Sequence, residues 1–180
     1  MSTGIRLRLD HLATPIGRLA LVVDADGNLC GVGFTDGEKK MDRQVRAFAN
    51  DAALELVPEA NPGGVTELLS AYFDGDLAAI DRVGVSFGGT PFQKSVWNAL
   101  REIPCGETWS YGELARRIGK PAAVRAVGLA NGANPVGIVV PCHRVIGADG
   151  SMTGYGGGIE RKKWLLAHEK RAGRNLELFA

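Results

Sequence analysis

Apolar and polar positions alternate along the first half of the chain as they do in strands of a half-buried sheet. A turn at residues 14–17 and the hairpin pair Asp26-Gly27 separate the alternating segments. Apolar residues at helical spacing follow, and after them residues 75–89 could link the two halves, with a short strand at 83–85. The predicted strands are residues 5–9, 19–23 and 29–34, and the predicted helices are residues 38–49 and 62–73.

The second half opens with the signals of a helix start. Thr90 suits the N-cap, Pro91 suits the first helical position, and Gln93 completes a capping box. The apolar face that follows predicts a helix that ends before Pro104. A three-residue apolar run, 138–140, predicts a buried strand. A glycine-rich loop over 154–158 and a last helix over 160–170 are predicted after it.

Two short helices are predicted between these elements. A second capping box at residues 110–113 opens the first helix, which ends at Gly119. The next helix spans residues 122–132 and ends at Gly132. Two short helices joined by a glycine-containing turn are typical of a helix-turn-helix. The pattern fits an ordinary helical hairpin as well, and the second helix offers mainly alanine and glycine rather than the polar side chains that identify bases.

Composition and charge narrow the class of protein. The 180 residues are 45% hydrophobic and 23% charged, as in ordinary globular proteins, and the longest apolar runs are far too short for a membrane span. Residues 1–89 carry 8 basic and 13 acidic side chains, whereas residues 90–180 carry 13 and 7. This asymmetry supports nucleic-acid binding. The three scattered cysteines and the lack of a signal-peptide core favour free thiols and a cytoplasmic location.

One cysteine has neighbours that suggest chemistry. Cys142 follows the predicted strand directly, and His143 and Arg144 come after it. Positive charge near a thiol lowers its pKa and so increases the fraction of nucleophilic thiolate. A buried structural cysteine is the alternative, and a zinc site fits less well because no second ligand pair has the required spacing. Adjacent side chains of an extended segment point in opposite directions, so a proton relay to His143 would need a bridging water.

The segment from Val140 to Gly147, Val-Pro-Cys-His-Arg-Val-Ile-Gly, resembles the active-site signature of the O6-alkylguanine-DNA alkyltransferases, also called methylated-DNA–protein-cysteine methyltransferases. The resemblance covers residues 88–171 strongly and the first half only by length and element order. Other segments resemble the family in the same order along the chain: residues 103–108, 110–115, 125–128, 130–131, 134–135, 154–158 and 164–169.

The resemblance implies direct DNA repair. An alkyl group would pass irreversibly from O6 of guanine, and from O4 of thymine, to Cys142, once per molecule. His143 would be the water-linked base, oriented by Glu169. Tyr111 would supply a proton to the leaving guanine, and Asn134 would brace the turn before the cysteine. From the residues alone, Tyr111 also fits a partly buried aromatic, and Asn134 a plain pre-proline turn residue.

The same resemblance implies how DNA would be held. The damaged base would be flipped out of the duplex from the minor groove, and Arg125 would take its place. A surface arginine paired with a carboxylate is the alternative for Arg125. The main-chain carbonyls of Cys142 and Val145 would bind the guanine amine. Further implied DNA contacts are Ser110, Ala123, Ala126, Gly128, Ala130 and Asn131. The implied base pocket consists of Val145, Met152, Tyr155, Gly156 and Gly157.

The expected fold is α+β. A ribonuclease-H-like α/β domain would span residues 1–85, and a winged-helix-like domain with the helix-turn-helix would span 90–175. Some relatives bind zinc in the first domain, but only His11 and Cys30 are candidates here, so no metal and no cofactor are expected. The expected partner is double-stranded DNA that contains O6-alkylguanine. It would be bound without sequence specificity by a monomer, with no membrane involved.

Two rival functions belong to other classes. A non-catalytic module that binds alkylated bases would share the scaffold, but such relatives lack the acceptor cysteine, so Cys142 argues against it. A hydrolytic or redox enzyme that uses a Cys-His pair would turn over repeatedly, and the predicted geometry of Cys142 and His143 suits it poorly. Cys105 is assigned no role. Gly156 replaces a serine of some relatives, which removes one hydrogen bond to the base.

Overall fold

The computed structural model describes residues 4–50 and 52–178, with side chains as far as Arg174. Backbone contacts divide the chain into two compact units, Met1–Gly89 and Thr90–Ala180. Helices and sheets occur together, and the expected α+β class is confirmed. Within the described ranges, no helix is long and apolar enough to cross a membrane.

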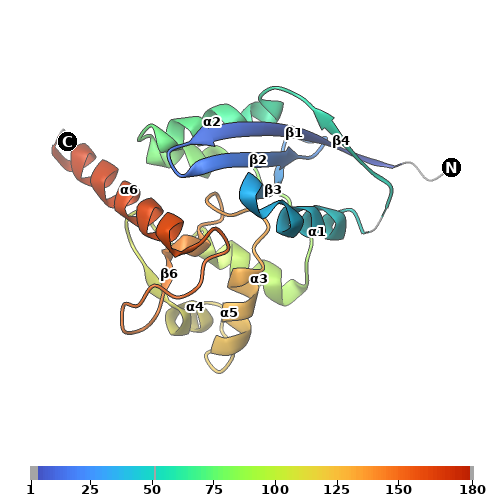
Figure 1. The fold of residues 1–180 in the computed structure, drawn as a ribbon. Coiled ribbons are helices and arrows are strands. Elements are labelled where there is room, and N and C mark those ends of the chain that lie inside the picture. The colour runs from blue at the N-terminus through green and yellow to red at the C-terminus, as the bar shows by residue number, and fades with distance from the viewer. Residues whose placement is uncertain (1–3, 51, 179–180) are drawn as a thin grey trace. The chain divides into compact units, whose positions relative to one another are not determined.

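The first unit is built on a four-stranded sheet (Figure 1). The strands β1 (Ile5–Thr14), β2 (Gly17–Val23) and β3 (Leu29–Phe34) form an antiparallel meander, as the alternation of apolar residues predicts. A fourth strand, β4 (Leu54–Pro58), pairs in parallel with β1, so the order is β3-β2-β1-β4.

Helices cover both faces of this sheet, because side chains alternate between its faces. Helix α1 (Glu38–Phe48) packs on the face that carries Ala20 and Val22. Helix α2 (Val65–Phe73) begins on the other face, where the Thr66 hydroxyl donates to Asp10 over 2.7 Å. The predicted helices 38–49 and 62–73 are thus present, with the first turn of the second as a separate 3₁₀ turn, Pro62–Gly64.

The second unit is mainly helical. Helix α3 (Pro91–Leu100) begins with the predicted capping box, in which the Thr90 hydroxyl accepts from the Gln93 N–H and the Gln93 side chain accepts from the Thr90 N–H. It packs with α4 (Tyr111–Arg117) and α5 (Val124–Gly132), the two short helices expected from the pattern (Figure 1). The long last helix is α6 (Ile159–Leu178). Two short parallel strands, β5 (Trp109–Ser110) and β6 (Val145–Ile146), complete the unit.

Two strand predictions are wrong. Residues 138–140 are buried but form a turn, in which the Val140 N–H donates to the Val136 carbonyl and Ile138 has a φ of 73°. Burial and β-branched side chains are typical of a strand, but here the chain must reverse before it reaches Cys142, and it forms a turn instead. The strand predicted over 83–85 is a single bridge between Val85 and Leu29. Strand β4 was not predicted.

Candidate active site

Cys142 lies at the start of a 3₁₀ turn, Cys142–Arg144, rather than at the end of a strand. Local hydrogen bonds fix its backbone: the Cys142 N–H donates to the Val140 carbonyl over 2.8 Å, and the Val145 N–H donates to the Cys142 carbonyl. The cysteine is 8% exposed, so it lies at the edge of the buried interior. In a 3₁₀ turn successive side chains diverge by about 120°. The side chains of Cys142 and His143 therefore leave the backbone in different directions, although the segment is not extended.

His143 and Glu169 form a buried pair. His143 Nε2 lies 2.8 Å from Glu169 Oε1, and both side chains are completely buried. An ionised carboxylate only accepts hydrogen bonds, so His143 Nε2 carries the proton and Nδ1 is the basic nitrogen. His143 Nδ1 is itself buried and has no hydrogen-bond partner among the described residues. The pair thus leaves one imidazole nitrogen ready to accept a proton.

Arg144 binds the same carboxylate. Its Nε and Nη2 donate to the two oxygens of Glu169 over 3.0 and 2.9 Å, and its Nη1 donates to the Ile103 carbonyl over 2.7 Å. Burial alone raises the pKa of Glu169, but the hydrogen bond from His143 and the charge and hydrogen bonds of Arg144 outweigh it and hold the pKa well below its usual range. Glu169 is therefore ionised, as the tautomer of His143 requires.

Asn134 braces the turn that leads to the cysteine. Its side-chain N–H donates to the Val140 carbonyl over 2.8 Å, and its side-chain oxygen accepts from the Val136 N–H over 2.9 Å. Asn134 is buried, so both bonds are shielded from water. The amide thus ties the two ends of the turn over residues 136–140 together, two residues before Cys142.

Tyr111 begins helix α4 and lies against α5. A Cβ built on Gly128 would be 3.8 Å from Tyr111 Cδ1, an ordinary van der Waals distance, so the tyrosine ring lies directly against this part of α5. The Tyr111 hydroxyl oxygen accepts a hydrogen bond from the Thr153 hydroxyl over 3.0 Å. Tyr111 is half-buried, and its hydroxyl therefore lies beside the loop that follows β6.

The residues that the family resemblance implies as the base pocket lie in β6 and in the loop between β6 and α6. Val145 is buried, Tyr155 is partly buried, and Met152 is 36% exposed. Burial, together with the Cys142 sulfur, raises the pKa of Tyr155 well above its usual value, so its hydroxyl stays protonated. Gly156 and Gly157 lie in the loop just before α6.

Helix α5 presents a distinct exposed face. Arg125 and Leu129 lie one turn apart on it, and Leu129 is 74% exposed. Ala123 and Ala126 flank this face, whereas Ala130 and Asn131 are buried on the opposite side, where the Ala130 carbonyl accepts from the Trp97 indole. Ala130 and Asn131 therefore lie away from the exposed face that carries Arg125, and their predicted contacts with DNA stay a prediction. Ser110 caps α4, since its hydroxyl accepts from the Glu113 N–H.

Two buried charged residues were not among the predicted site residues, although Arg144 was noted as a positive charge near Cys142. Arg144 neutralises Glu169, and Lys162 on α6 donates from Nζ to the Val145 and Thr153 carbonyls over 2.6 and 2.9 Å. Lys162 is fully buried, and burial lowers its pKa. A signal was available for Arg144, which directly follows the Cys-His pair. Lys162 stands among charged neighbours on a helix, and nothing in that pattern distinguishes it.

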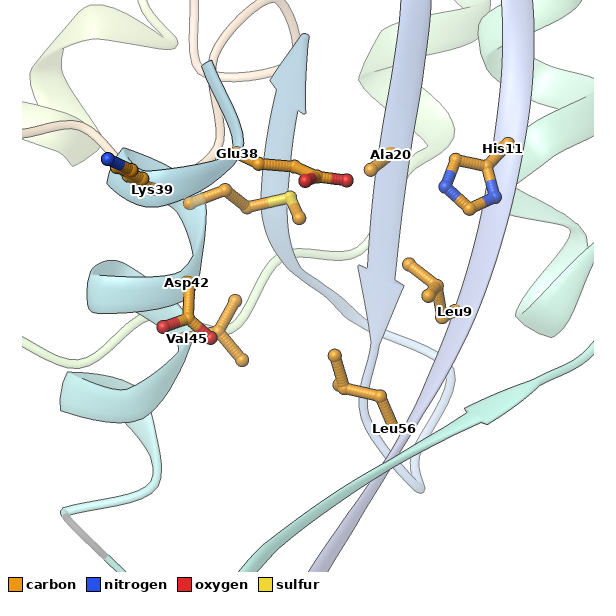
Figure 2. A pocket seen from close by; sticks show the side chains of 9 residues that line it. Leu9, His11, Ala20, Glu38, Lys39, Asp42, Val45 and Leu56 are labelled. Atoms are coloured by element: carbon orange, nitrogen blue, oxygen red, sulfur yellow. The ribbon is translucent and has the colours of Figure 1, made fainter. Parts of the chain in front are cut away.

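A separate hollow lies in the first unit, between α1 and the strands β1, β2 and β4 (Figure 2). It measures 350 Å³ and has an apolar floor that includes Leu9 and Val45. Charged side chains of α1 line its rim, and Asp42 among them is paired with Arg46. No cysteine lines it. In the described part of the chain, no group of three or more His, Cys, Asp and Glu side chains could hold a metal ion. His11 and Glu38 do line the hollow, but it offers no cysteine nucleophile.

Cys142 and the buried His143–Glu169 pair lie in the same unit as two short helices joined by a turn, which defines a class of proteins that combine a helix-turn-helix with a site containing cysteine and histidine. Comparison with known proteins makes the class specific. Residues 91–171 match the family described as 6-O-methylguanine DNA methyltransferase, DNA binding domain.

Other relatives are similar to this chain over the first unit as well as the second. A methylated-DNA–protein-cysteine methyltransferase of Salmonella typhimurium is 48% identical over 165 residues, which cover 92% of this chain and 96% of that protein. One from Methanosarcina acetivorans is 49% identical over 156 residues, covering 87% and 94%. The crystal structure of Mycobacterium tuberculosis OGT in complex with DNA has 41% identity and a TM-score of 0.74, covering 93% and 94%. The chain belongs to the methylated-DNA–protein-cysteine methyltransferase family.

Proposed function

We propose that this protein repairs DNA directly, by moving an alkyl group from O6 of guanine to the sulfur of Cys142. The observation that carries the proposal is the fixed tautomer of His143, whose Nε2 is held by Glu169 while Nδ1 stays buried and unpartnered among the described residues. A base prepared in this way, on the residue next to a cysteine, suits removal of the thiol proton.

The proposed reaction conserves protons and electrons. The Cys142 thiol proton passes through a bridging water to His143 Nδ1. The thiolate forms the S–C bond to the alkyl carbon, the C–O6 bond breaks, and its electron pair stays on the guanine. The Tyr111 hydroxyl gives its proton to a ring nitrogen of that guanine, and the proton held by His143 restores the tyrosine through solvent. The thioether has no leaving group of comparable quality, so each molecule reacts once.

The carbonyls proposed to bind the guanine amine are already oriented. The Cys142 carbonyl accepts from the Val145 N–H, and the Val145 carbonyl accepts from Lys162 Nζ. Each carbonyl oxygen has a second lone pair, which an amine of the substrate can use. The thymine lesion O4-alkylthymine also leaves as an anion stabilised by a ring nitrogen, and we include it in the proposed substrate range.

The DNA would be bound through the exposed face of α5. The relative from Mycobacterium tuberculosis was crystallised with DNA. Here α5 offers mostly small side chains around Arg125, which suits close approach to the minor groove without sequence specificity. A base must leave the stack before a thiol can reach it, at a cost of a few kcal/mol, and Arg125 would fill the gap. The protein would act as a monomer on double-stranded DNA.

Intact mass spectrometry after incubation with O6-methylguanine DNA tests the proposal. We expect one added methyl group per molecule, on the peptide that contains Cys142, and none in the Cys142→Ala variant, which should still bind DNA. Cys105 is an internal control because it is exposed, whereas Cys142 is buried. Non-specific alkylation would therefore reach Cys105 first. Methyl transfer in Cys142→Ala, or none in the wild type, contradicts the proposal. The absence of transfer together with tight binding of the lesion would favour the non-catalytic module.

A further inference from the structure

We propose that Thr153 is a positioning residue that sets the direction of the Tyr111 hydroxyl during alkyl transfer. The inference rests on the proposed function, since it concerns the proton that Tyr111 gives to the leaving base. Its basis is the hydrogen bond from the Thr153 hydroxyl to the Tyr111 hydroxyl oxygen, 3.0 Å long. These two residues are 42 positions apart in the sequence, so the contact depends on the fold.

The direction of this hydrogen bond matters, because a tyrosine hydroxyl has only one proton. With the Thr153 hydroxyl as donor, the Tyr111 oxygen is an acceptor and its own proton is free to point at the substrate. The bond also strengthens when that proton leaves, because negative charge then develops on the Tyr111 oxygen. Thr153 therefore stabilises the state in which the guanine has been protonated more than the state before transfer, which is the condition for a rate effect.

Thr153 itself is held in place by a buried charge. The Lys162 ammonium donates to the Thr153 carbonyl over 2.9 Å and to the Val145 carbonyl over 2.6 Å. Lys162 is fully buried on α6, where it cannot move without losing both bonds. The ammonium thus joins the two ends of the loop over residues 146–152. The threonine is exposed, but its backbone is anchored to the same group that orients the Val145 carbonyl of the proposed base site.

A double-mutant cycle on the full-length protein tests the inference. Single-turnover methyl transfer is measured at saturating O6-methylguanine DNA for the wild type, Thr153→Val, Tyr111→Phe and the double variant. We expect Thr153→Val to slow transfer about three- to tenfold, as the loss of one hydrogen bond would. It should have no further effect in the Tyr111→Phe background, where the accepting oxygen is absent. Thr153→Ser keeps the hydroxyl and should restore the rate. Thr108→Val, at another exposed threonine of this unit, serves as the matched control.

Two further measurements separate positioning from a structural role. The affinity for DNA and the midpoint of thermal unfolding should be unchanged in Thr153→Val. An equal loss of rate in the wild-type and Tyr111→Phe backgrounds would overturn the inference, as would a Thr153→Val variant with the wild-type rate. A failure of the proposed function looks different, because the wild type itself would then transfer no methyl group to Cys142.

Discussion

Glu169 receives hydrogen bonds from a histidine and an arginine, both buried with it. A buried carboxylate without such partners would take up a proton rather than remain charged. Arg144 donates to both carboxylate oxygens and so fixes the position of the Glu169 carboxylate. His143 Nε2 therefore donates to an anion that is held in place. The arginine therefore does more than balance charge. It keeps Glu169 ionised, and this in turn fixes the tautomer of His143.

The substitution Glu169→Gln removes the counter-charge of this cluster and should destabilise the protein at pH 7. Breaking one partner of a buried ion pair costs about 3–5 kcal/mol, because the remaining charge stays desolvated. Denaturant unfolding measures the change. Glu160→Gln is the matched control, since Glu160 lies on the same helix but its side chain is 89% exposed and pairs with the exposed Lys163. It should change stability by less than about 1 kcal/mol.

The difference in stability between the wild type and Glu169→Gln should depend on pH in a definite direction. Above the ordinary carboxyl pKa of about 4.3, Glu169 is ionised in both the folded and the unfolded protein, and its stabilising contribution is complete. As the pH falls below that value, the unfolded chain binds a proton that folded Glu169 resists, because its folded pKa is lowered. The advantage of the wild type over Glu169→Gln should therefore shrink between pH 7 and pH 3. A difference that is constant or grows over this range would contradict the lowered pKa.

Among the elements of the second unit, helix α5 has an exposed face with few polar side chains that could identify bases. Arg125 is the one basic side chain among its described residues, and its neighbours on the exposed face are small or apolar, with Val124 and Leu129 the largest. Arg125→Ala should slow repair of O6-methylguanine in duplex DNA far more than dealkylation of free O6-benzylguanine, because only the duplex substrate requires a base to leave the stack. Rate constants for both substrates test this prediction. Lys94→Ala, on the exposed surface of α3, is the control, and equal losses on the two substrates would exclude a role in flipping.

Helix starts could be predicted from the sequence because their signals are local. The capping box of Thr90 and Gln93 involves four consecutive residues and forms as expected. Ser110 likewise caps α4. The meander in the first unit was equally accessible, because side chains alternate along its strands with a period of two and turn signals separate the strands. Strand β4 could not be predicted in this way, since its five residues pair with β1 from far along the chain and three of them are exposed.

The segment before the cysteine shows why the rest could not be predicted. Residues 138–140 have the composition of a buried strand, but Asn134 holds the chain in a turn through hydrogen bonds to Val136 and Val140. Ile138 then adopts a left-handed conformation that is costly for a β-branched residue. Such strain is tolerated where surrounding contacts determine the backbone. Lys162 and Thr153 could not be predicted from the sequence either, because their roles depend on contacts with residues that only the fold brings close.

The charge of the whole molecule is divided sharply at residue 89. The first half carries five more acidic than basic side chains, and the second half carries six more basic than acidic ones. Binding to a phosphate backbone should therefore depend on the second half alone. For each phosphate contact, the slope of log affinity against log salt changes by about 0.9 for duplex DNA.

Lys120→Ala tests this division on the full-length protein. Lys120 is exposed and lies between α4 and α5, so its loss should weaken binding to every duplex sequence alike and make the salt slope shallower by about one unit. Lys39→Ala, at a lysine on α1 of the acidic half that is also exposed, should leave the slope unchanged. Titrations of labelled duplex over a range of salt concentrations give both slopes. If the two substitutions alter the slope equally, the acidic half also contacts the phosphates, and DNA binding cannot be assigned to the second half.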